Sequence, residues 1–392
     1  MRIVWINDKA EFTGGAETYI YQSVQELNKR DNVENILLYS VNSRIDYEYF
    51  KVFSFATVLA DLKQQLEHIR PDIIYVHQVS DIETIKGLLE IDTPVVGFIH
   101  DHKYFCLREH KYTTIGNKTC TKAVGVDCYG CLGFINKKNS FPYITINSVS
   151  NIKSIQNLIK RFEHMVVGSE YMKAHLLLHD FEEGKVSKIR LFSEQKNDLE
   201  NKNINKKEKR FLFVGQLVRG KGLDTLLTAF SKIKNKECKL DICGDGKQRK
   251  ELEEKAKSIG ISSRIKFHGK VNANELSRYY DNAYAVIIPS RAPETFNLVG
   301  VEAMKHARVV IATNVGGVKE WLKDRGNGFS FPSNDDDKLA LIMDYTIKNP
   351  NIIKQMGENG LKDYKKNFRS KIHCDKIYDL FETILRKDTY VA

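Results

Sequence analysis

Short apolar segments alternate along the chain with longer segments whose apolar residues recur every three or four positions. The short segments are typical of strands buried on both faces, and the longer ones of amphipathic helices. The segments predicted as strands are Arg2–Ile6, Ile36–Tyr39, Ile73–Val76, Val95–His100, Met165–Val167, Lys188–Leu191, Phe211–Val214, Leu240–Cys243, Ile265–His268, Ala285–Ile288, Val309–Ala312 and Gly328–Phe331. Helices are predicted between them, the first two over Glu17–Leu27 and Val58–His68. This alternation predicts parallel sheets of the α/β class.

The alternation stops in a polar, low-complexity stretch and then restarts, which predicts two domains. We expect a Rossmann-like domain over residues 1–193, a linker over 194–209 and a second Rossmann-like domain over 210–368. The apolar spacing of Ser370–Arg386 predicts a final helix within residues 369–392. Two doubly wound domains facing each other would form a cleft between the carboxyl ends of both sheets.

Composition narrows the class of protein. The chain has 392 residues, 42% apolar and 28% charged, as in soluble globular proteins. No apolar run approaches the roughly 18 residues that a membrane helix needs, and Ile3–Ile6 is too short for a signal-peptide core. A cytoplasmic protein is therefore expected.

The net charge of +11 is unevenly distributed. Residues 1–190 carry 23 basic and 23 acidic side chains, whereas residues 191–392 carry 38 and 27. A basic second half suits a phosphate-bearing ligand, an anionic membrane surface or nucleic acid, and solubility alone is the simplest explanation. No pattern of a known nucleic-acid module is present, so no nucleic-acid partner is expected.

The stretch Pro289–Met304 is the most informative for chemistry. It places Glu294 in a polar loop and Glu302 eight residues later, in the next predicted helix. Two solvated acids are the ordinary explanation of such a pair, but this loop follows a predicted strand, where open α/β sheets bind ligands. Glu294 and Glu302 lie on either side of the free N–H groups at the start of this helix. The arrangement predicts a site that binds a sugar nucleotide.

Other strand-end loops carry candidate ligand groups. Gly14-Gly15 precedes a helix, where glycines let N–H groups approach a phosphate, although paired glycines also form ordinary turns. His100 closes a strand and is either a core histidine or a partner for a sugar hydroxyl. Arg219 and Lys221 lie on a glycine-rich turn suited to a diphosphate, without the spacing of a Walker motif.

Together these loops carry a family resemblance. The chain resembles the retaining GT-B glycosyltransferases of glycosyltransferase family 4, and the match covers nearly the whole chain in the family's order. The motifs are Gly14-Gly15-Ala-Glu17, His100-Asp101, Val214-Gly215-x-Leu217-x3-Lys221-Gly222, Cys243-Gly-Asp-Gly246, Phe267-His-Gly269, Pro289-Ser290-x3-Glu294-x7-Glu302-Ala303 and Val315-Gly316-Gly317.

The resemblance implies a role for each site residue. Glu302 would hold the ribose of the nucleotide, Glu294 and His100 the donor sugar, and Lys221 the diphosphate. Those three donor-sugar and diphosphate residues, His100, Glu294 and Lys221, form the implied catalytic set. The further residues implied to bind the donor are Gly15, Gln216, Arg219, Lys270, Val271, Phe296, Asn297, Leu298 and Val299. The family's last helix also crosses back onto the first domain, which the final predicted helix would do here.

Two positions depart from the family pattern. Gln216 stands where many members have arginine, and Arg219 lies on the same turn as a substitute cation. Asn297 stands where a glycine is common, which puts the backbone path around the sugar in question.

The implied reaction is a hexosyltransferase-type transfer, with retention, from a nucleoside diphosphate sugar to an acceptor hydroxyl. Cations and the helix N-terminus would stabilise the departing diphosphate, so no catalytic metal is expected. Asp335-Asp336-Asp337 is interpreted as a helix cap rather than a metal site.

Four cysteines cluster in a segment with little regular pattern, the insert 106–131. The spacing of Cys106, Cys120, Cys128 and Cys131 allows a four-thiolate structural zinc site, with scattered small apolar residues as the alternative.

Alternatives to a transferase remain at this stage. A non-catalytic GT-B partner subunit and a sugar-nucleotide epimerase share the expected fold. The acceptor is a sugar, a lipid-linked group or a protein, in cell-surface polysaccharide, glycolipid or glycoprotein synthesis. The basic second half leaves open a peripheral contact with the inner face of the membrane.

Overall fold

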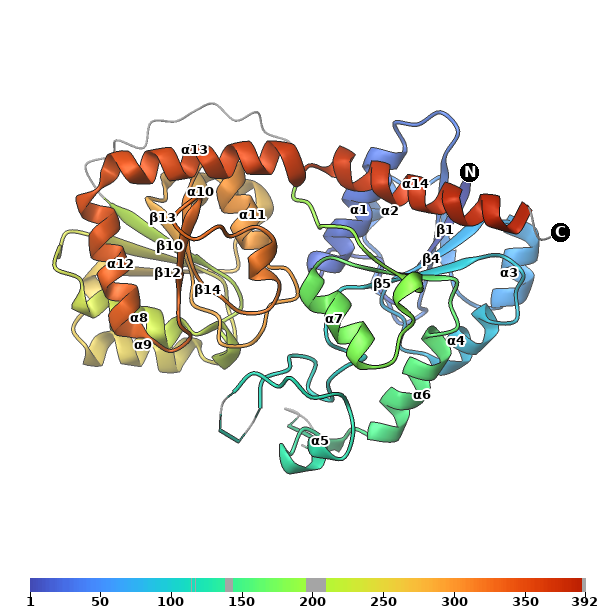
Figure 1. Ribbon diagram of the computed structural model, residues 1–392, viewed down its shortest axis with the longest axis horizontal. Helices are drawn as coiled ribbons and strands as arrows, with labels where there is room; N and C mark the ends of the chain where they lie inside the picture. Colours follow the sequence, from blue (N-terminus) through green and yellow to red (C-terminus); the bar gives the residue numbers. More distant parts are fainter. Residues whose placement is uncertain (114, 117, 138–143, 195–208, 390–392) are drawn as a thin grey trace. The chain divides into compact units, whose positions relative to one another are not determined.

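The chain folds into two units (Figure 1), seen in a computed structural model that describes residues 1–392 except 114, 117, 138–143, 195–208 and 390–392. Unit 1 comprises Met1–Ile115, Thr121–Glu194 and the chain from Ser370 onward. Unit 2 comprises residues 116–120 and 195–369. Most of the predicted linker, residues 195–208, lies outside the described residues.

Unit 1 is built on a seven-stranded parallel sheet with the order β3-β2-β1-β4-β5-β8-β9. Its strands are β1 Arg2–Asn7, β2 Glu34–Tyr39, β3 Phe55–Val58, β4 Ile73–Val76, β5 Val95–Ile99, β8 His164–Val167 and β9 Val186–Lys188. Its helices are α1 Gly15–Leu27, α2 Tyr47–Phe50, α3 Leu62–Ile69, α4 Ile82–Leu88, α5 Asp127–Gly130, α6 Val149–Ile159, α7 Glu170–Leu178, the 3-10 turn η1 Glu183–Lys185 and α14 Ser370–Thr389. A separate antiparallel hairpin pairs β6 Ile135–Lys137 with β7 Ile144–Ile146.

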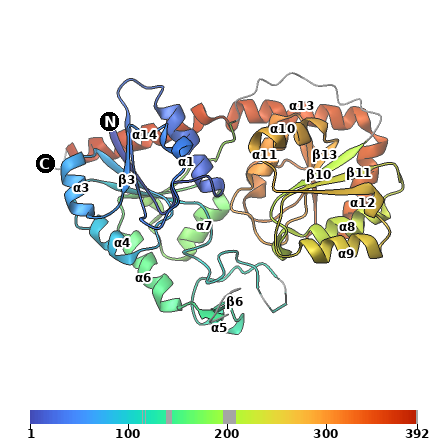
Figure 2. The same ribbon diagram turned by 180° about the vertical axis from the view of Figure 1, so that it is seen from behind.

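The last helix belongs to unit 1, although it is remote in sequence from the rest of it. Helix α14 packs against α1, as Figures 1 and 2 both show. Arg30 and Asp375 form an ion pair of 2.6 Å, and the Tyr19 hydroxyl lies 2.8 Å from Nε2 of His373. These contacts anchor the end of the chain on the first sheet.

Unit 2 is built on a six-stranded parallel sheet with the order β12-β11-β10-β13-β14-β15. Its strands are β10 Arg210–Val214, β11 Lys239–Cys243, β12 Ile265–Gly269, β13 Ala285–Ile288, β14 Val309–Thr313 and β15 Gly328–Phe331. Its helices and 3-10 turns are η2 Arg219–Lys221, α8 Leu223–Lys232, α9 Arg249–Ser258, η3 Ser262–Arg264, α10 Ala273–Asn282, α11 Leu298–Lys305, η4 Gly317–Glu320, α12 Asp336–Lys348 and α13 Pro350–Asn367. The order reverses between β10 and β13, which marks the switch point where open α/β sheets bind ligands.

The predicted parallel α/β class is confirmed in both units, and the fully buried strands were predicted most closely. Strands β4, β13 and β15 match their predicted bounds. The predicted helix Val58–His68 was wrong at its start, because Val58 ends edge strand β3 and Asp61 caps α3 by accepting a hydrogen bond from the Gln64 N–H. Strand β9 ends at Lys188, where the prediction had a strand begin.

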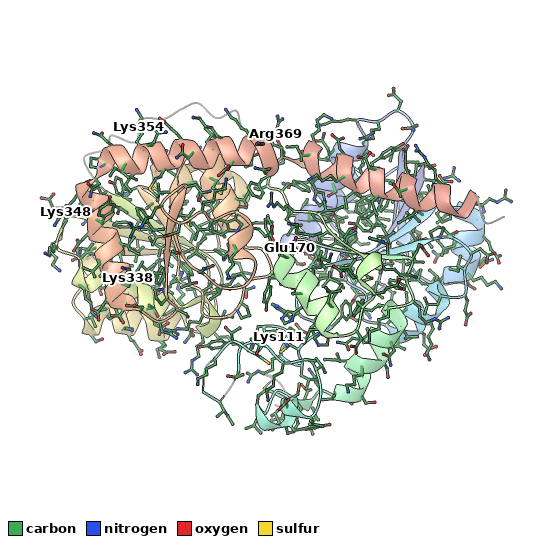
Figure 3. All side chains as sticks on the ribbon, viewed as in Figure 1. Lys111, Glu170, Lys338, Lys348, Lys354 and Arg369 are labelled. Carbon is green, nitrogen blue, oxygen red and sulfur yellow. The ribbon has the colours of Figure 1, made fainter. Side chains whose placement is uncertain are left out.

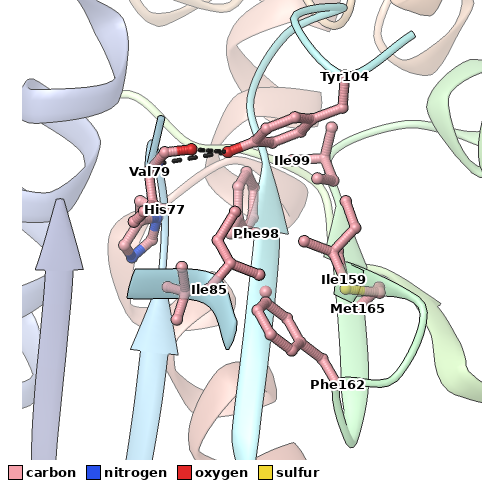
Figure 4. A pocket seen from close by; sticks show the side chains of 11 residues that line it. His77, Val79, Ile85, Phe98, Ile99, Tyr104, Ile159, Phe162 and Met165 are labelled. Atoms are coloured by element: carbon pink, nitrogen blue, oxygen red, sulfur yellow. Dashed lines mark hydrogen bonds between the residues drawn. The ribbon is translucent and has the colours of Figure 1, made fainter. Parts of the chain in front are cut away.

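A small apolar cavity lies beneath the sheet of unit 1 (Figure 4). It is lined by residues of β4, β5, α4 and α6, including Val76, Phe98 and Ile159. The Tyr104 hydroxyl closes it by donating to the Val79 carbonyl at 2.7 Å. Apart from His77, whose Nδ1 lies 2.9 Å from Nε2 of His100, its lining is aliphatic and aromatic, as in the rest of the core.

The excess positive charge of the second half falls largely on solvated helix faces. Four exposed cations illustrate this (Figure 3). Lys338 and Lys348 lie on α12, Lys354 lies on α13, and Arg369 follows α13. No helix among the described residues combines the length and apolar character needed to cross a bilayer.

Unit 1 holds a set of buried, neutral histidines. Burial, and then the charge of His373, lowers the pKa of His100 to about 3. Burial, followed by neighbouring charges, lowers the pKa of His102 and of His175 to about 3. Burial lowers the pKa of His373 to about 4.

We predict that acid unfolds unit 1 before unit 2. Unfolded histidine has a pKa of about 6.5, so the unfolded unit binds more protons as the pH falls from there toward 3, and stability is lost over that range. At a pH of about 5, each of these histidines would cost roughly 2 kcal/mol if it titrated alone.

Each unit contains one buried tryptophan, Trp5 in unit 1 and Trp321 in unit 2. Trp321→Phe leaves Trp5 as the reporter, and Trp5→Phe leaves Trp321. Acid titration of fluorescence should give a higher midpoint pH for Trp5. Coincident midpoints, or an earlier change at Trp321, would contradict the prediction.

Candidate active site

Three loops of unit 2 converge at the carboxyl edge of its sheet, at the switch point. They follow β10, β13 and β14 and contain Gly220, Glu294 and Gly316 respectively. Their backbones contact one another directly. The site is therefore built from main-chain geometry before any side chain is considered.

The loops after β10 and β13 are joined through one carbonyl. The Gly220 oxygen accepts hydrogen bonds from the N–H groups of Arg291 at 2.8 Å and Ala292 at 3.0 Å. Gly222, which precedes α8, has φ +67°, and a Cβ there would lie 2.0 Å from the Pro289 carbonyl oxygen. Only glycine fits this approach without displacing the neighbouring loop.

The loop after β14 holds Glu294 from the other side. The Glu294 carbonyl accepts from the Gly317 N–H at 2.6 Å. Gly316 has φ +59°, and a Cβ there would lie 2.2 Å from the same carbonyl oxygen. The backbone of Glu294 is thus fixed by its neighbours after β14.

The side chain of Glu294 is also held. Nζ of Lys221 donates to its two carboxylate oxygens at 2.8 and 3.0 Å, and the Ser290 hydroxyl donates to Oε1. Thr313 supports this arrangement by donating to the Ser290 carbonyl at 2.6 Å. The structure therefore brings Lys221 and Glu294, two residues of the predicted catalytic set, into one ion pair.

The turn into α11 keeps the path expected of a glycine. Asn297 has φ +69°, in the left-handed region that asparagine tolerates better than most residues. The helix start has no side-chain cap, so the N–H groups of Leu298 and Val299 have no capping oxygen. Asn297 therefore gives this turn a backbone conformation that glycine adopts readily. Its side chain does not cap the helix.

Phe296 and Trp321 anchor this turn from the core. The Trp321 indole N–H donates to the Phe296 carbonyl at 2.8 Å, and both side chains are buried. A Cβ on Gly300 would lie 2.3 Å from the Trp321 ring, so α11 depends on glycine there. The structure places the Phe296 ring inside the fold.

Glu302 lies one turn further along α11 and is held by Tyr280. The buried Tyr280 hydroxyl donates to Oε2 at 2.6 Å. Burial raises the pKa of Glu302, while the hydrogen bond from Tyr280 and the charge of Lys305 oppose that rise. The Tyr280 ring stacks on His306, with centroids 5.3 Å apart and an interplanar angle of 17°.

Other predicted donor residues lie on neighbouring loops of unit 2. Gln216 and Arg219 follow β10 and have exposed side chains. Lys270 and Val271 follow β12, the former exposed and the latter half-buried. These four residues lie on the same carboxyl edge as Glu294.

Gly15 and His100 belong to unit 1. Gly15 begins α1 at the end of the loop after β1, and a Cβ there would meet no atom within 4 Å. His100 follows β5, and its Nε2 lies 2.9 Å from Nδ1 of His77. Its low pKa keeps the imidazole neutral near pH 7, able to hydrogen-bond without carrying a charge.

The predicted metal sites have different outcomes. Asp335 caps α12 by accepting from the Lys338 N–H at 2.8 Å, which confirms its interpretation as a helix cap.

Cys106, Cys128 and Cys131 lie in unit 1, whereas Cys120 lies in the short segment assigned to unit 2. Across the described part of the chain, no three His, Cys, Asp or Glu side chains are grouped to hold a metal ion. Structural zinc stays a prediction.

Comparison with known proteins shows the family to which the chain belongs. The family described as glycosyl transferases group 1 matches residues 194–363, which contain Lys221, Glu294 and Glu302. An uncharacterized glycosyltransferase of Methanocaldococcus jannaschii is 31% identical over 253 residues, covering 61% of this chain and 68% of that protein. The chain belongs to the glycosyl transferases group 1 family.

A second uncharacterized glycosyltransferase of Methanocaldococcus jannaschii is 34% identical over 157 residues, a match that spans only 40% of either protein. Among solved structures, Anabaena HepE in complex with UDP-glucose has a TM-score of 0.70 at 18% identity, covering 98% of this chain and 100% of that one. The two parallel α/β units of this group 1 chain therefore have the GT-B fold.

Two residues that support the candidate site of this group 1 chain were not assigned from sequence. Ser290 was part of the quoted motif but was given no role. Its position four residues before Glu294 was the only sequence signal for a contact between its hydroxyl and that carboxylate. Tyr280 lies on α10, 22 residues before Glu302, and no local pattern links the two.

We predict that Gly316→Ala destabilises unit 2, whereas Gly15→Ala leaves stability nearly unchanged. Alanine at residue 316 would combine a left-handed backbone with a clash against Glu294, costing more than about 2 kcal/mol. Denaturant unfolding measures both effects: Trp321 fluorescence in a Trp5→Phe background reports on the change at residue 316, and Trp5 fluorescence in a Trp321→Phe background reports on the change at residue 15. Equal stability of the two variants would contradict it.

Proposed function

We propose that the chain is a retaining, hexosyltransferase-type glycosyltransferase that moves a sugar from a nucleoside diphosphate sugar to an acceptor hydroxyl. The observation that carries this proposal is the ion pair of Lys221 and Glu294, fixed at the switch point beside the uncapped start of α11. A cation and free helix N–H groups match the diphosphate of such a donor, and the carboxylate beside them matches its sugar.

Each part of the donor has a chemically suitable group. The diphosphate is an anion, which suits Lys221, the exposed Arg219 and the N–H groups of Leu298 and Val299. The sugar hydroxyls are donors, which suit the carboxylate of Glu294. Support also comes from HepE, whose solved complex contains UDP-glucose.

Glu302 is proposed to hold the ribose hydroxyls. Tyr280 occupies one of its carboxylate oxygens, Oε2, and leaves Oε1 to accept from a ligand. The backbone around Lys270 and Val271, at the end of β12, would pair with the base. Gln216 contributes a polar contact on the phosphate turn.

Unit 1 would supply the remaining contacts. Neutral His100 is proposed to bind the donor sugar, with one ring nitrogen already used by His77. The Gly15 N–H, at the start of α1, would approach the diphosphate, since its glycine leaves the backbone open.

The proposed step breaks the bond between the anomeric carbon and the leaving phosphate oxygen. The acceptor oxygen forms its bond on the same face, and its proton passes to the leaving phosphate. Lys221, Arg219 and the helix N-terminus stabilise the negative charge that develops on the diphosphate. This chemistry is proposed to proceed without a metal, and it uses no carboxylate pair of the glycosidase kind.

The acceptor is proposed to be a sugar, a lipid-linked group or a protein in cell-surface polysaccharide, glycolipid or glycoprotein synthesis on the cytoplasmic side. A non-catalytic partner subunit and an epimerase are the competing functions. The complete set of Lys221, Glu294, Glu302 and His100 disfavours a subunit that has lost catalysis.

The first test is a panel of nucleoside diphosphate sugars. One donor should release its nucleoside diphosphate slowly even without acceptor, and chelators should not reduce the rate. Glu302→Ala should lower donor affinity at least about tenfold, since it removes a charged hydrogen-bonding group.

Failure of every donor to bind, with Glu302→Ala behaving like the wild type, would overturn the enzymatic proposal. Sugar interconversion without nucleotide release would instead identify an epimerase. Donor binding without turnover, in the presence of a broad acceptor mixture, would favour the partner subunit.

The second test concerns Tyr280. Tyr280→Phe keeps the stack on His306 but removes the hydroxyl that donates to Glu302, so the pKa of Glu302 should rise further. Donor binding needs the charged carboxylate of Glu302. When the pH is lowered, the variant should therefore begin to lose donor affinity at a higher pH than the wild type does. At neutral pH binding should weaken about tenfold, or about 1.4 kcal/mol.

Tyr284→Phe is the matched control. It removes a hydrogen bond of equal length, 2.6 Å to the Thr346 carbonyl, from another buried tyrosine. Titration calorimetry across pH should separate the two variants. The same pH profile in both would contradict the role given to Tyr280.

A further inference from the structure

Two histidines meet at the carboxyl edge of the first sheet. Strands β4 and β5 are parallel neighbours, so the residues that follow them lie at the same edge. His77 follows β4 and His100 follows β5, and Nδ1 of His77 lies 2.9 Å from Nε2 of His100. This distance is that of a hydrogen bond between two imidazoles.

The His77 ring lies in an aromatic environment and is only 2% exposed. It stacks on Trp5, with ring centroids 5.3 Å apart and an interplanar angle of 4°. The Tyr75 ring meets it at an angle of 61°, with centroids 4.4 Å apart. The same histidine borders the apolar cavity of unit 1 (Figure 4). These contacts fix the plane of the His77 ring.

One ring nitrogen of His77 has no use in this environment. Burial, followed by the charges of His100 and His373, lowers the pKa of His77 well below its usual value, so the bond joins two neutral rings. Either ring can contribute the N–H of that bond. In both arrangements the buried Nε2 of His77 has no hydrogen-bond partner among the described residues.

A buried nitrogen without a partner lowers stability. An apolar side chain at residue 77 would avoid this cost and would suit the surrounding aromatic rings. Folding alone therefore does not explain the histidine, whereas its bond to His100 does.

The bond determines which edge of the His100 ring is available to a ligand. His100 is half-buried, and its ring centroid lies 4.4 Å from that of Phe98 and 5.2 Å from that of Tyr19. Such contacts barely distinguish the imidazole from the same ring turned by 180°, in which carbon atoms replace the nitrogens. The turned ring would lose its bond to His77. The bond therefore leaves Nδ1 for a ligand, and within the described part of the chain no hydrogen bond reaches that atom.

The main chain beside His100 is held by separate contacts. Nε2 of Gln78 donates to Oδ2 of Asp101 at 3.1 Å, and the Lys103 N–H donates to Oδ1 of the same carboxylate at 2.8 Å. Loss of the His77 side chain would therefore free the His100 ring without releasing its backbone.

We propose that His77 is a positioning residue for the donor sugar, acting by holding the His100 ring in the orientation that presents Nδ1 to a sugar hydroxyl. His77 itself is too deeply buried to touch the ligand. The unpaired nitrogen is then a cost to folding that is retained for binding. This role rests on the proposed function, in which His100 binds the donor sugar.

The first measurement uses the free protein with ¹⁵N-labelled histidine. An N–H···N bond between the two rings should give a coupling between the ¹⁵N nuclei of His77 and His100, each assigned by the loss of its signals when that residue is replaced. Absence of this coupling from the wild type would overturn the proposal. The result does not depend on any donor or on the proposed activity.

The second measurement compares His77→Leu with His77→Asn, whose side chains are similar in size. The asparagine amide can still hydrogen-bond to the His100 ring, but it buries additional polar atoms, so this variant should be the less stable of the two. Donor affinity should follow the opposite order. The nucleoside diphosphate sugar selected by the donor panel should bind about fivefold more weakly to the leucine variant than to the asparagine variant.

The same nucleoside diphosphate without its sugar should bind equally to both variants, because His100 is proposed to contact only the sugar. Titration calorimetry measures both ligands, and denaturant unfolding measures the order of stability.

The matched control is His164→Leu. It removes another histidine hydrogen bond of 2.9 Å, to the Ser187 hydroxyl, at the amino end of β8 in the same sheet. This variant should bind the donor like the wild type.

Three results with a donor that binds the wild type would overturn the role of His77 and leave the proposed function intact. They are equal donor affinity in the two His77 variants, weaker donor binding by the less stable asparagine variant, and an equal loss of affinity for the nucleotide with and without its sugar. Failure of every nucleoside diphosphate sugar to bind the wild type would overturn the proposed function, and this role with it, even where the coupling is present.

Discussion

The close approach of three backbone segments at the carboxyl edge of the second sheet determines the rest of the candidate site. Gly222 and Gly316 approach carbonyl oxygens of the neighbouring loop at distances that a Cβ would prevent. The Gly220 carbonyl joins two of these loops by accepting from the N–H groups of Arg291 and Ala292. Glu294 is fixed by these contacts through its main chain. Its side chain then needs only Lys221 and Ser290 to hold it, so the carboxylate loses little conformational freedom when a ligand binds.

The two site carboxylates lie in different electrostatic environments, and this difference suits different tasks. Glu294 contacts a lysine ammonium and a hydroxyl. Glu302 is held by a neutral tyrosine, and burial raises its pKa. A ligand that offers hydroxyl donors to Glu302 would add stabilisation to the charged form, so binding and ionisation of this carboxylate are coupled.

Sequence patterns predicted the parts of the structure that depend on burial on both faces. Strands such as β13 are continuous apolar runs, and the loops that follow them are short, so the positions of Lys221 and Glu294 could be inferred. Edge strand β3 could not, because its residues are mostly half-exposed and its pattern gives no strong period. Tyr280 and Trp321 were missed for another reason: each acts on the site through a tertiary contact from a remote segment, which no local spacing encodes.

Asn297 shows how the structure changes the meaning of a sequence feature. The departure from glycine at Asn297 weakened the sequence argument, yet the residue adopts the left-handed backbone that glycine would supply. The net positive charge made the second half the expected place for a contact with an anionic partner. A charge total, however, does not distinguish solvated lysines from cations beside apolar side chains.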